Sequence, residues 1–262
     1  MHPKKSLGQN FLKSKSAIRA MLSAGEISPT DIVLEVGPGK GILTEALLEV
    51  AKKVFAVEKD ESLVELLREK FSAEISTGKL ELISADILEF EPQSYKLEAQ
   101  NYKLIANIPY YITGQFLRKF LSGTCKPQSM VVMLQKEVAK RIVARDGKES
   151  ILSISVKAYG DVSYVETVPA KYFSPEPKVD SAILAIKNIS SSFFKDIDEK
   201  KFFEILKAGF AHKRKFVVRN LETYTNPRKI AEIFEKNGLN RSLRPENLTL
   251  ENWKQITISL SC

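Results

Sequence analysis

The 262-residue chain contains only two cysteines and two histidines. Cys125 and Cys262 do not make a disulfide framework, which fits a reducing compartment such as the cytoplasm. Together with His2 and His212 they are too few and too far apart in the sequence for a plausible zinc site. We therefore expect a cytoplasmic protein without a metal cofactor.

Long hydrophobic runs are also absent. No apolar run reaches the roughly 18 residues that a membrane-spanning helix needs, and residues 1–6 lack the apolar core of a secretory signal. The Gly-x-x-x-x-Gly-Lys-Ser/Thr loop of nucleotide hydrolases is missing as well. We expect a protein that has no membrane partner, does not hydrolyse nucleotides and acts as a monomer.

The most informative motif is Asn107-Ile108-Pro109-Tyr110, which follows the apolar run 104–106, where a buried strand would end. A side-chain amide, a backbone carbonyl and an aromatic face suit the exocyclic amine of a flat base. Hydrogen bonds from adenine N6 to the Asn107 oxygen and the Ile108 carbonyl would draw the nitrogen lone pair out of the ring. Pro109 holds Ile108 extended, and Tyr110 offers a stacking surface worth about 1–3 kcal/mol per base.

A glycine-rich turn lies between a strand-like and a helix-like segment at residues 31–48. Gly37, Gly39 and Gly41 tolerate a positive φ and let a ligand approach the backbone closely. Their spacing is Gly-x-Gly-x-Gly, so the dinucleotide fingerprint Gly-x-Gly-x-x-Gly is not met. This spacing, and the lack of a catalytic histidine candidate, count against an NAD dehydrogenase.

Two acidic residues also follow strand-like segments. Glu58 ends a strand 21 positions after Gly37 and is placed to accept hydrogen bonds from both hydroxyls of a ribose. Asp86 ends the next strand and is a candidate acceptor for an adenine amino group. The glycine turn, Glu58, Asp86 and Asn107 thus stand at the carboxyl ends of four predicted strands, where open α/β sheets bind ligands.

In these motifs the chain closely resembles the ribosomal RNA adenine dimethyltransferases, the KsgA-type family that uses S-adenosylmethionine. The resemblance covers nearly the whole chain and continues in Leu7–Leu12, Met133–Val138, Phe173–Ala182, Gly209-Phe210, Lys213–Lys215 and Asn220-Leu221. It implies a Rossmann-like α/β sheet that binds S-adenosylmethionine, followed by a small C-terminal helical domain.

The resemblance also implies site residues. Cofactor contacts fall on Asn10, Leu12, Gly37, Glu58, Asp86 and Asn107. The catalytic set is Asn107, Ile108, Pro109, Tyr110 and Phe173. Phe173 stands in a proline-rich loop, where we expect an exposed ring that sandwiches the target adenine against Tyr110.

The family acts on two adjacent adenines in the terminal hairpin loop of small-subunit rRNA and adds two methyl groups to each. The implied partner is therefore small-subunit rRNA or the pre-ribosomal small subunit. Two alternatives within this reading remain open. One is the large-subunit dimethyltransferase of the macrolide-resistance type, and the other is a non-catalytic RNA- or DNA-binding factor in assembly or transcription.

The net charge of +8 is unevenly distributed. Residues 200–262 hold 13 Lys+Arg and 6 Asp+Glu, a net of +7, while the remaining 27 and 26 leave +1 for residues 1–199. Such asymmetry is typical of a protein with a polyanionic partner. The densest patch is Lys213, Arg214 and Lys215 with Arg219, our predicted RNA-binding residues. A second basic stretch, Lys4–Arg19, precedes the first acid at Glu26.

The chain is predicted to have two domains. Residues 1–190 form the cofactor-binding catalytic domain, and residues 199–262 form a basic helical RNA-docking domain. Strands are expected at 130–134 and within 161–187, and helices at 14–24, 136–145, 199–210, 226–237 and 249–258. The polar segment between Asn188 and Lys201 is the expected boundary.

Overall fold

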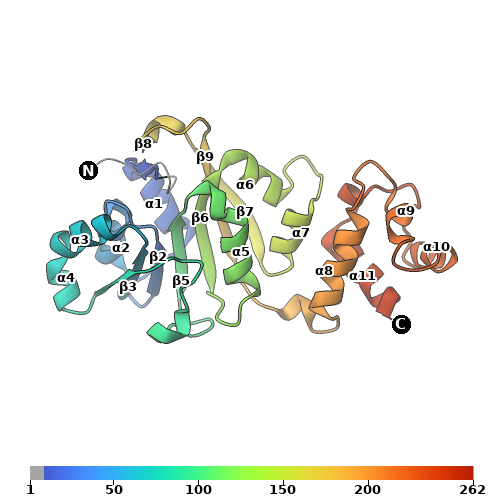
Figure 1. Ribbon diagram of the computed structural model, residues 1–262, viewed down its shortest axis with the longest axis horizontal. Coiled ribbons are helices and arrows are strands. Elements are labelled where there is room, and N and C mark those ends of the chain that lie inside the picture. Colours follow the sequence, from blue (N-terminus) through green and yellow to red (C-terminus); the bar gives the residue numbers. More distant parts are fainter. Residues whose placement is uncertain (1–8, 262) are drawn as a thin grey trace. The chain divides into compact units, whose positions relative to one another are not determined.

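The computed structural model describes residues 9–261 (Figure 1). These divide into two compact units. The sheet unit comprises the described residues up to Ala139 together with Asp161–Ile189, and the helical unit comprises Lys140–Gly160 together with the described residues from Ser190 onward. Because the segment 140–160 groups with the C-terminal helices, the helical unit begins earlier in the sequence than the expected domain 199–262.

The sheet unit contains a seven-stranded sheet of order β4-β3-β2-β5-β6-β9-β7. The five strands from β4 to β6 are parallel, and β9 runs antiparallel to both of its neighbours. A separate two-stranded ladder pairs β1 with β8. The strand bounds are β1 Phe11–Leu12, β2 Ile32–Val36, β3 Lys53–Glu58, β4 Leu80–Ser84, β5 Lys103–Asn107, β6 Ser129–Gln135, β7 Asp161–Val168, β8 Phe173–Ser174 and β9 Ser181–Lys187.

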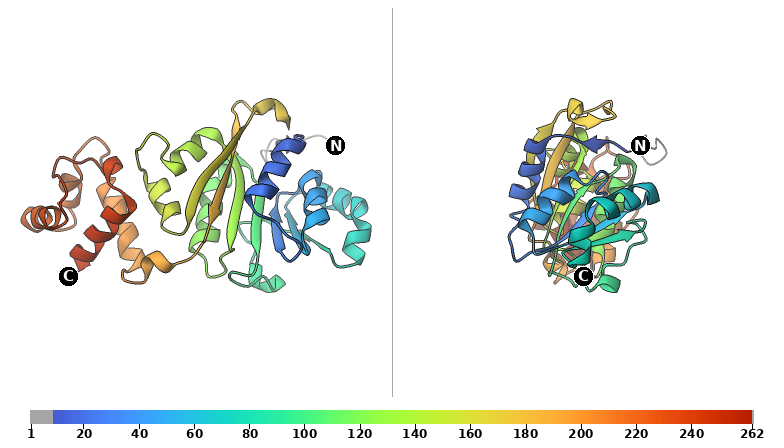
Figure 2. Two further views of the ribbon diagram at one scale, coloured as in Figure 1. Left: turned by 180° about the vertical axis from the view of Figure 1, so that it is seen from behind. Right: turned by 90° about the vertical axis from the view of Figure 1, so that its left-hand side faces the viewer.

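Helices cover both faces of this sheet. Figure 1 shows α5 in front of the strands, and the reverse view in Figure 2 shows α1 in front. The central strands are therefore buried on both sides, and residues 130–134 of β6 are all 1% exposed or less, as their unbroken apolar run predicts. The helix bounds are α1 Lys15–Ala24, α2 Ile42–Val50, α3 Glu61–Lys70, α4 Ser72–Ser76, α5 Thr113–Ser122 and α6 Lys136–Val143.

The helical unit packs around large aromatic side chains. Trp253, Phe202 and Phe234 are each fully buried, and a Cβ at Gly209 would lie 2.2 Å from the Trp253 ring. The predicted helices appear as α8 Glu199–Gly209, α10 Pro227–Lys236 and α11 Leu250–Ser261. This unit also contains two shorter α-helices, α7 Ile151–Lys157 and α9 Val217–Leu221.

Hydrogen bonds explain why the segment 140–160 belongs to the helical unit. The Glu149 amide donates to the Glu246 carbonyl at 2.8 Å, and the Tyr159 hydroxyl donates to the Glu199 carboxylate. Such contacts join residues far apart in the sequence, so periodicity along the chain gives no sign of them.

The strand order fixes where a ligand site can form. From β2 the chain moves outward through β3 to β4, and it then returns to place β5 on the other side of β2. Loops leaving β2 and β5 therefore diverge and open a crevice at the carboxyl ends of the strands. The glycine turn follows β2 and the Asn107–Tyr110 motif follows β5, so both stand at this point.

Candidate active site

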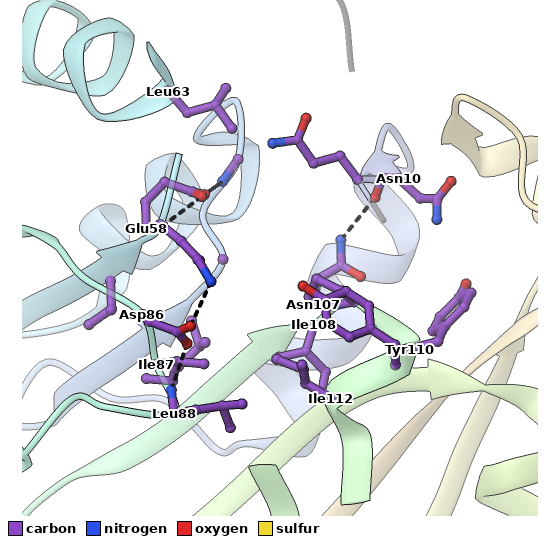
Figure 3. A pocket seen from close by; sticks show the side chains of 18 of the residues that line it. Asn10, Glu58, Leu63, Asp86, Ile87, Leu88, Asn107, Ile108, Tyr110 and Ile112 are labelled. Carbon is purple, nitrogen blue, oxygen red and sulfur yellow. Dashed lines mark hydrogen bonds and ion pairs between the residues drawn. The ribbon is translucent and has the colours of Figure 1, made fainter. Parts of the chain in front are cut away.

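A single pocket brings together the residues that follow four parallel strands (Figure 3). The carboxyl end of β2 contributes Gly37 and Gly39, β3 contributes Glu58, and the residues after β4 include Asp86. The Asn107–Tyr110 motif after β5 forms the opposite wall. Its remaining lining comes mainly from apolar side chains and from residues 9–11 near the N-terminal end of the described chain.

The glycine turn needs glycine for two separate reasons. Gly37 and Gly39 have φ angles of 72° and 60°, in the left-handed region that other residues avoid. A Cβ at Gly37 would lie 3.2 Å from the Asn107 carbonyl oxygen, and one at Gly39 would lie 2.9 Å from the Phe11 ring. The turn therefore packs its backbone directly against two other walls of the pocket.

Glu58 is held by backbone donors. The residue is 8% exposed. Its carboxylate accepts hydrogen bonds from the backbone amides of Gly39 at 3.1 Å, Lys59 at 2.9 Å and Asp60 at 3.0 Å. Burial raises the pKa of Glu58, while these three amide donors act in the opposite direction. The result is a carboxylate with a fixed orientation at the pocket wall.

Asp86 has a cationic partner that the sequence did not reveal. The Lys59 ammonium lies 2.7 Å from one carboxylate oxygen of Asp86, and the Leu88 amide donates to the other at 2.9 Å. The hydrogen bond from Lys59 is the main cause that lowers the pKa of Asp86. Any adenine amino group that reaches Asp86 must therefore share this carboxylate with Lys59.

Asn107 links the motif to the N-terminal segment. Its amide nitrogen lies 3.4 Å from the Asn10 carbonyl oxygen, so the amide oxygen takes no part in that hydrogen bond (Figure 3). On the other side, Gln9 donates to the Asp60 carboxylate at 2.8 Å. Residues 9–11 thus run between the ends of β3 and β5, and Gln9 lines the pocket although the sequence analysis assigned it no contact.

Tyr110 and the residue that follows the motif, Tyr111, differ sharply in exposure. Tyr110 is half-buried and its hydroxyl lies 2.8 Å from the Ser181 hydroxyl, with burial raising its pKa. Tyr111, the next residue, is 64% exposed and also lines the pocket. The sequence singled out Tyr110 alone, because only Tyr110 belongs to the recognised motif.

The expected exposure of Phe173 is wrong. Its ring is 2% exposed and lies in the hydrophobic core, because Phe173 belongs to β8 and pairs with Leu12 of β1. Leu12 is 6% exposed and is likewise a core residue that does not line the pocket. The stacking role of Phe173 stays a prediction, and it requires the ring to leave the hydrophobic core. The cofactor contact of Leu12 also stays a prediction, and it requires a change in the β1–β8 ladder or a contact through the Leu12 backbone.

Glu35 is a buried carboxyl that sequence reasoning passed over. It lies inside β2, two positions before Gly37, and is fully buried. Within the described part of the chain neither of its carboxyl oxygens has a hydrogen-bond partner. Burial raises its pKa to about 8, and the nearby Glu58 charge adds to the rise. A charged residue within an otherwise apolar strand was the signal available in the sequence.

The predicted RNA-binding residues belong to the helical unit. Lys213, Arg214 and Lys215 are exposed and immediately precede α9, which carries Arg219. Arg219 forms an ion pair with Glu222 at 3.0 Å. The loop before this patch is anchored by the buried Asn220, which donates to the carbonyls of Gly209 and His212. Four residues of the sequence motifs, Lys4, Lys5, Leu7 and Gly8, lie outside the described residues.

A parallel sheet with one reversed strand near its edge, and a ligand pocket at its switch point, defines the class of Rossmann-like methyltransferases. Two solved structures have a similar fold. The chain matches the structure titled 23S rRNA methyltransferase ErmE with a TM-score of 0.79 and 25% identity, covering 97% of this chain and 100% of that one. It matches a dimethyladenosine transferase from Plasmodium falciparum with a TM-score of 0.81 and 26% identity, covering 94% and 95%.

The particular family follows from the sequence comparisons. The model of the ribosomal RNA adenine dimethylase family matches residues 1–261, and the chain belongs to that family. A relative named ribosomal RNA small subunit methyltransferase A, from Dehalococcoides mccartyi, is 42% identical over 97% of this chain and 87% of its own length. Its namesake from Fusobacterium nucleatum is 38% identical, with 97% and 96% covered. The family and the Rossmann-like fold expected from the motifs are thereby confirmed.

Within residues 9–261, no helix is long and apolar enough to cross a membrane. The same residues contain no group of three or more histidine, cysteine or acidic side chains arranged to hold a metal ion.

Proposed function

We propose that this protein transfers methyl groups from S-adenosylmethionine to N6 of two adjacent adenines in the terminal hairpin loop of small-subunit rRNA. The observation that carries the proposal is the single pocket in which Glu58, Asp86 and Asn107–Tyr110 meet at the ends of neighbouring strands. Membership of the ribosomal RNA adenine dimethylase family supports the same chemistry.

The pocket fits the proposed cofactor. The backbone at Gly37 and Gly39 leaves no room for a side chain and brings the turn close to a ligand. The fixed carboxylate of Glu58 suits the two hydroxyls of a ribose, and Asp86 suits an adenine amino group. Asn10 and Asn107 close the opposite side. When bound, S-adenosylmethionine would supply a methyl group activated by its sulfonium, and attack of a positioned nucleophile on the methyl carbon would release the sulfur as a neutral thioether.

Asn107 and Ile108 orient the nucleophile. The amide oxygen of Asn107 and the carbonyl of Ile108 accept the two hydrogens on adenine N6, which directs the nitrogen lone pair away from the ring. Pro109, with φ −58° and ψ 136°, continues the extended backbone that fixes this carbonyl. Holding the two reacting atoms in a near-attack geometry lowers the barrier by roughly 7–11 kcal/mol.

Tyr110 supplies the stacking surface for the base. Its ring face also stabilises the positive charge that develops on the amine, by about 0.5–2 kcal/mol. The methylated amine is strongly acidic until it loses its proton, so water accepts that proton and no dedicated base is needed. The adenine must leave any base stack to enter the pocket, which favours a loop substrate.

The helical unit is proposed to dock on the phosphates of the small-subunit precursor through Lys213, Arg214, Lys215 and Arg219. The small-subunit assignment is supported by the relatives at 38–42% identity, against 25% for the 23S rRNA methyltransferase. The complete Asn-Ile-Pro-Tyr motif at the pocket argues against the alternative hypothesis that the protein is a non-catalytic RNA- or DNA-binding factor.

The test uses labelled S-adenosylmethionine with separated small- and large-subunit precursors, followed by mapping of the labelled nucleotides. We expect label on two adjacent adenines of the small-subunit precursor, and labelling that is about 10²–10³-fold slower with the Asn107→Ala variant. Label on the large-subunit precursor instead would assign the macrolide-resistance reaction. Absence of label from both precursors, with tight RNA binding retained, would favour the non-catalytic factor.

A further inference from the structure

Ser181 stands at the point where the last strand of the sheet meets the proposed base-binding wall. It is the first residue of β9 and pairs with Gln135 of β6 on one side and Val168 of β7 on the other. Its side chain is fully buried, and its hydroxyl lies 2.8 Å from the hydroxyl of Tyr110. A hydroxyl pair of this kind restrains both partners, since breaking it leaves the buried Ser181 hydroxyl without a partner and away from water.

Tyr110 is therefore held at both ends. At the backbone, the Thr113 hydroxyl donates to the Tyr110 carbonyl at 2.9 Å, and Thr113 is itself buried at the start of α5. At the tip of the ring, Ser181 holds the phenol. With both ends fixed, the long axis of the ring has one direction. Because a phenolic O–H prefers the plane of its own ring, the hydrogen bond to Ser181 also favours one ring plane.

Ser181 is itself anchored through its neighbour Asp180. The Lys136 amide donates to the Asp180 carbonyl at 3.0 Å, and the Lys136 ammonium lies 3.1 Å from the Asp180 carboxylate. The Ala170 amide donates to the same carboxylate at 3.2 Å. The entry to β9 is thus tied to the end of β6 and to the loop after β7.

We infer that Ser181 is a positioning residue that sets the angle of the Tyr110 ring and, through it, the plane of the target adenine. This inference rests on the proposed function. Without the Ser181 hydroxyl the ring still offers the same stacking area, so the RNA binds as before. The base then lies in a range of planes, and fewer bound complexes have N6 in line with the methyl group. The loss should appear in the rate and not in the affinity.

The test is a double-mutant cycle with Ser181→Ala, Tyr110→Phe and the two combined, measured as single-turnover methylation at saturating cofactor and RNA. We expect each single variant to lose about tenfold in rate, with RNA and cofactor dissociation constants unchanged within about twofold. The combined variant should lose no more than the slower single variant, because both changes remove the same hydrogen bond.

Tyr102→Phe is the matched control. Tyr102 is a buried tyrosine of the sheet unit whose hydroxyl donates to the Cys125 carbonyl at 2.8 Å, and it stands before the amino end of β5, away from the pocket. Its loss of a hydroxyl is expected to leave the methylation rate unchanged.

Two results would overturn the inference. One is a combined variant whose rate loss is the product of the two single losses. The other is a Tyr110→Phe variant with the wild-type rate, which decides the matter even where Ser181→Ala fails to fold. Either result, obtained beside a wild-type protein that methylates the small-subunit precursor, removes the role of Ser181 and leaves the proposed function standing.

Discussion

The two units present their charged groups in opposite ways. In the sheet unit the pocket carboxylates are oriented by specific partners, as Glu58 is by three backbone amides and Asp86 by Lys59 and Leu88. In the helical unit Lys213, Arg214 and Lys215 are exposed side chains on a loop. Groups fixed by such partners select a ligand by its shape, whereas exposed cations attract any phosphate chain. The pocket should therefore respond to geometry and pH, and the basic loop to salt.

The largest effect is expected from Asn107→Ala. Removing an acceptor that acts mainly in the transition state should lower the single-turnover rate by about 10²–10³, the range seen when one oxyanion-hole donor is lost. RNA binding should change little, because the helical unit is intact. Rapid-quench methylation at saturating cofactor gives the rate, and calorimetry gives the cofactor affinity. A variant with a near wild-type rate would mean that the pocket does not select by this contact.

Glu58→Ala should weaken S-adenosylmethionine binding by about 1–3 kcal/mol, the range for a hydrogen bond to a charged group. Titration calorimetry measures the change directly. Glu65→Ala is the matched control, because Glu65 is an exposed carboxylate of α3 that does not line the pocket. If both variants bind S-adenosylmethionine equally well, or if Glu58→Ala has gained affinity for NAD, the cofactor assignment is wrong.

Replacing Lys213, Arg214 and Lys215 by Ala should reduce the salt dependence of RNA binding. The slope of log K against log salt should flatten by about two to three units if each residue neutralises one phosphate. Cofactor affinity should stay unchanged. A control triple variant of the sheet unit, with Ala at the exposed Lys52, Arg68 and Arg118, removes the same charge elsewhere.

Filter binding over a range of salt concentrations compares the two triple variants, and circular dichroism checks that both are folded. Equal slopes in the two would show that the basic loop does not dock on RNA. The docking surface should then be sought in Lys4–Arg19.

An effect on stability, and not on activity or binding, concerns pH and the buried Glu35. Its pKa is about 8 in the folded protein, against an ordinary value of 4.5. Between these values the folded state binds more protons than the unfolded chain. The free energy of unfolding therefore falls as pH rises, by at most about 1.4 kcal/mol per pH unit from this group.

Glu35→Gln should remove that contribution. The free energy of unfolding of the variant, relative to that of the wild type, should therefore increase steadily between pH 5.5 and 7.5. Urea unfolding of the cofactor-free protein at several pH values measures the difference. Two stability curves that run parallel over this range would show that Glu35 titrates normally.

Much of the pocket could be predicted because its residues follow local patterns. Each parallel strand is a short, mainly apolar segment, and the residues at its end fall at the carboxyl edge of the sheet, so Gly37, Glu58, Asp86 and Asn107 were correctly predicted to lie together. What failed depends on contacts between distant residues. Phe173 is buried because it pairs with Leu12, and no pattern around Phe173 reveals that partner. The ion pair of Lys59 with Asp86 was missed for the same reason.

The place of β9 in the sheet has a consequence for synthesis of the chain. β7 pairs only with β9 among the described strands, and β9 is inserted between β6 and β7. A nascent chain that ends before Ser181 can already pair β2 to β6, but it leaves one edge of that sheet open and β7 without a partner. Closure then waits for the reversed strand, and such non-local pairing is slow. The same event delivers Ser181 to Tyr110, so the protein can assemble its cofactor crevice during translation before the tyrosine of its base-binding wall is fixed.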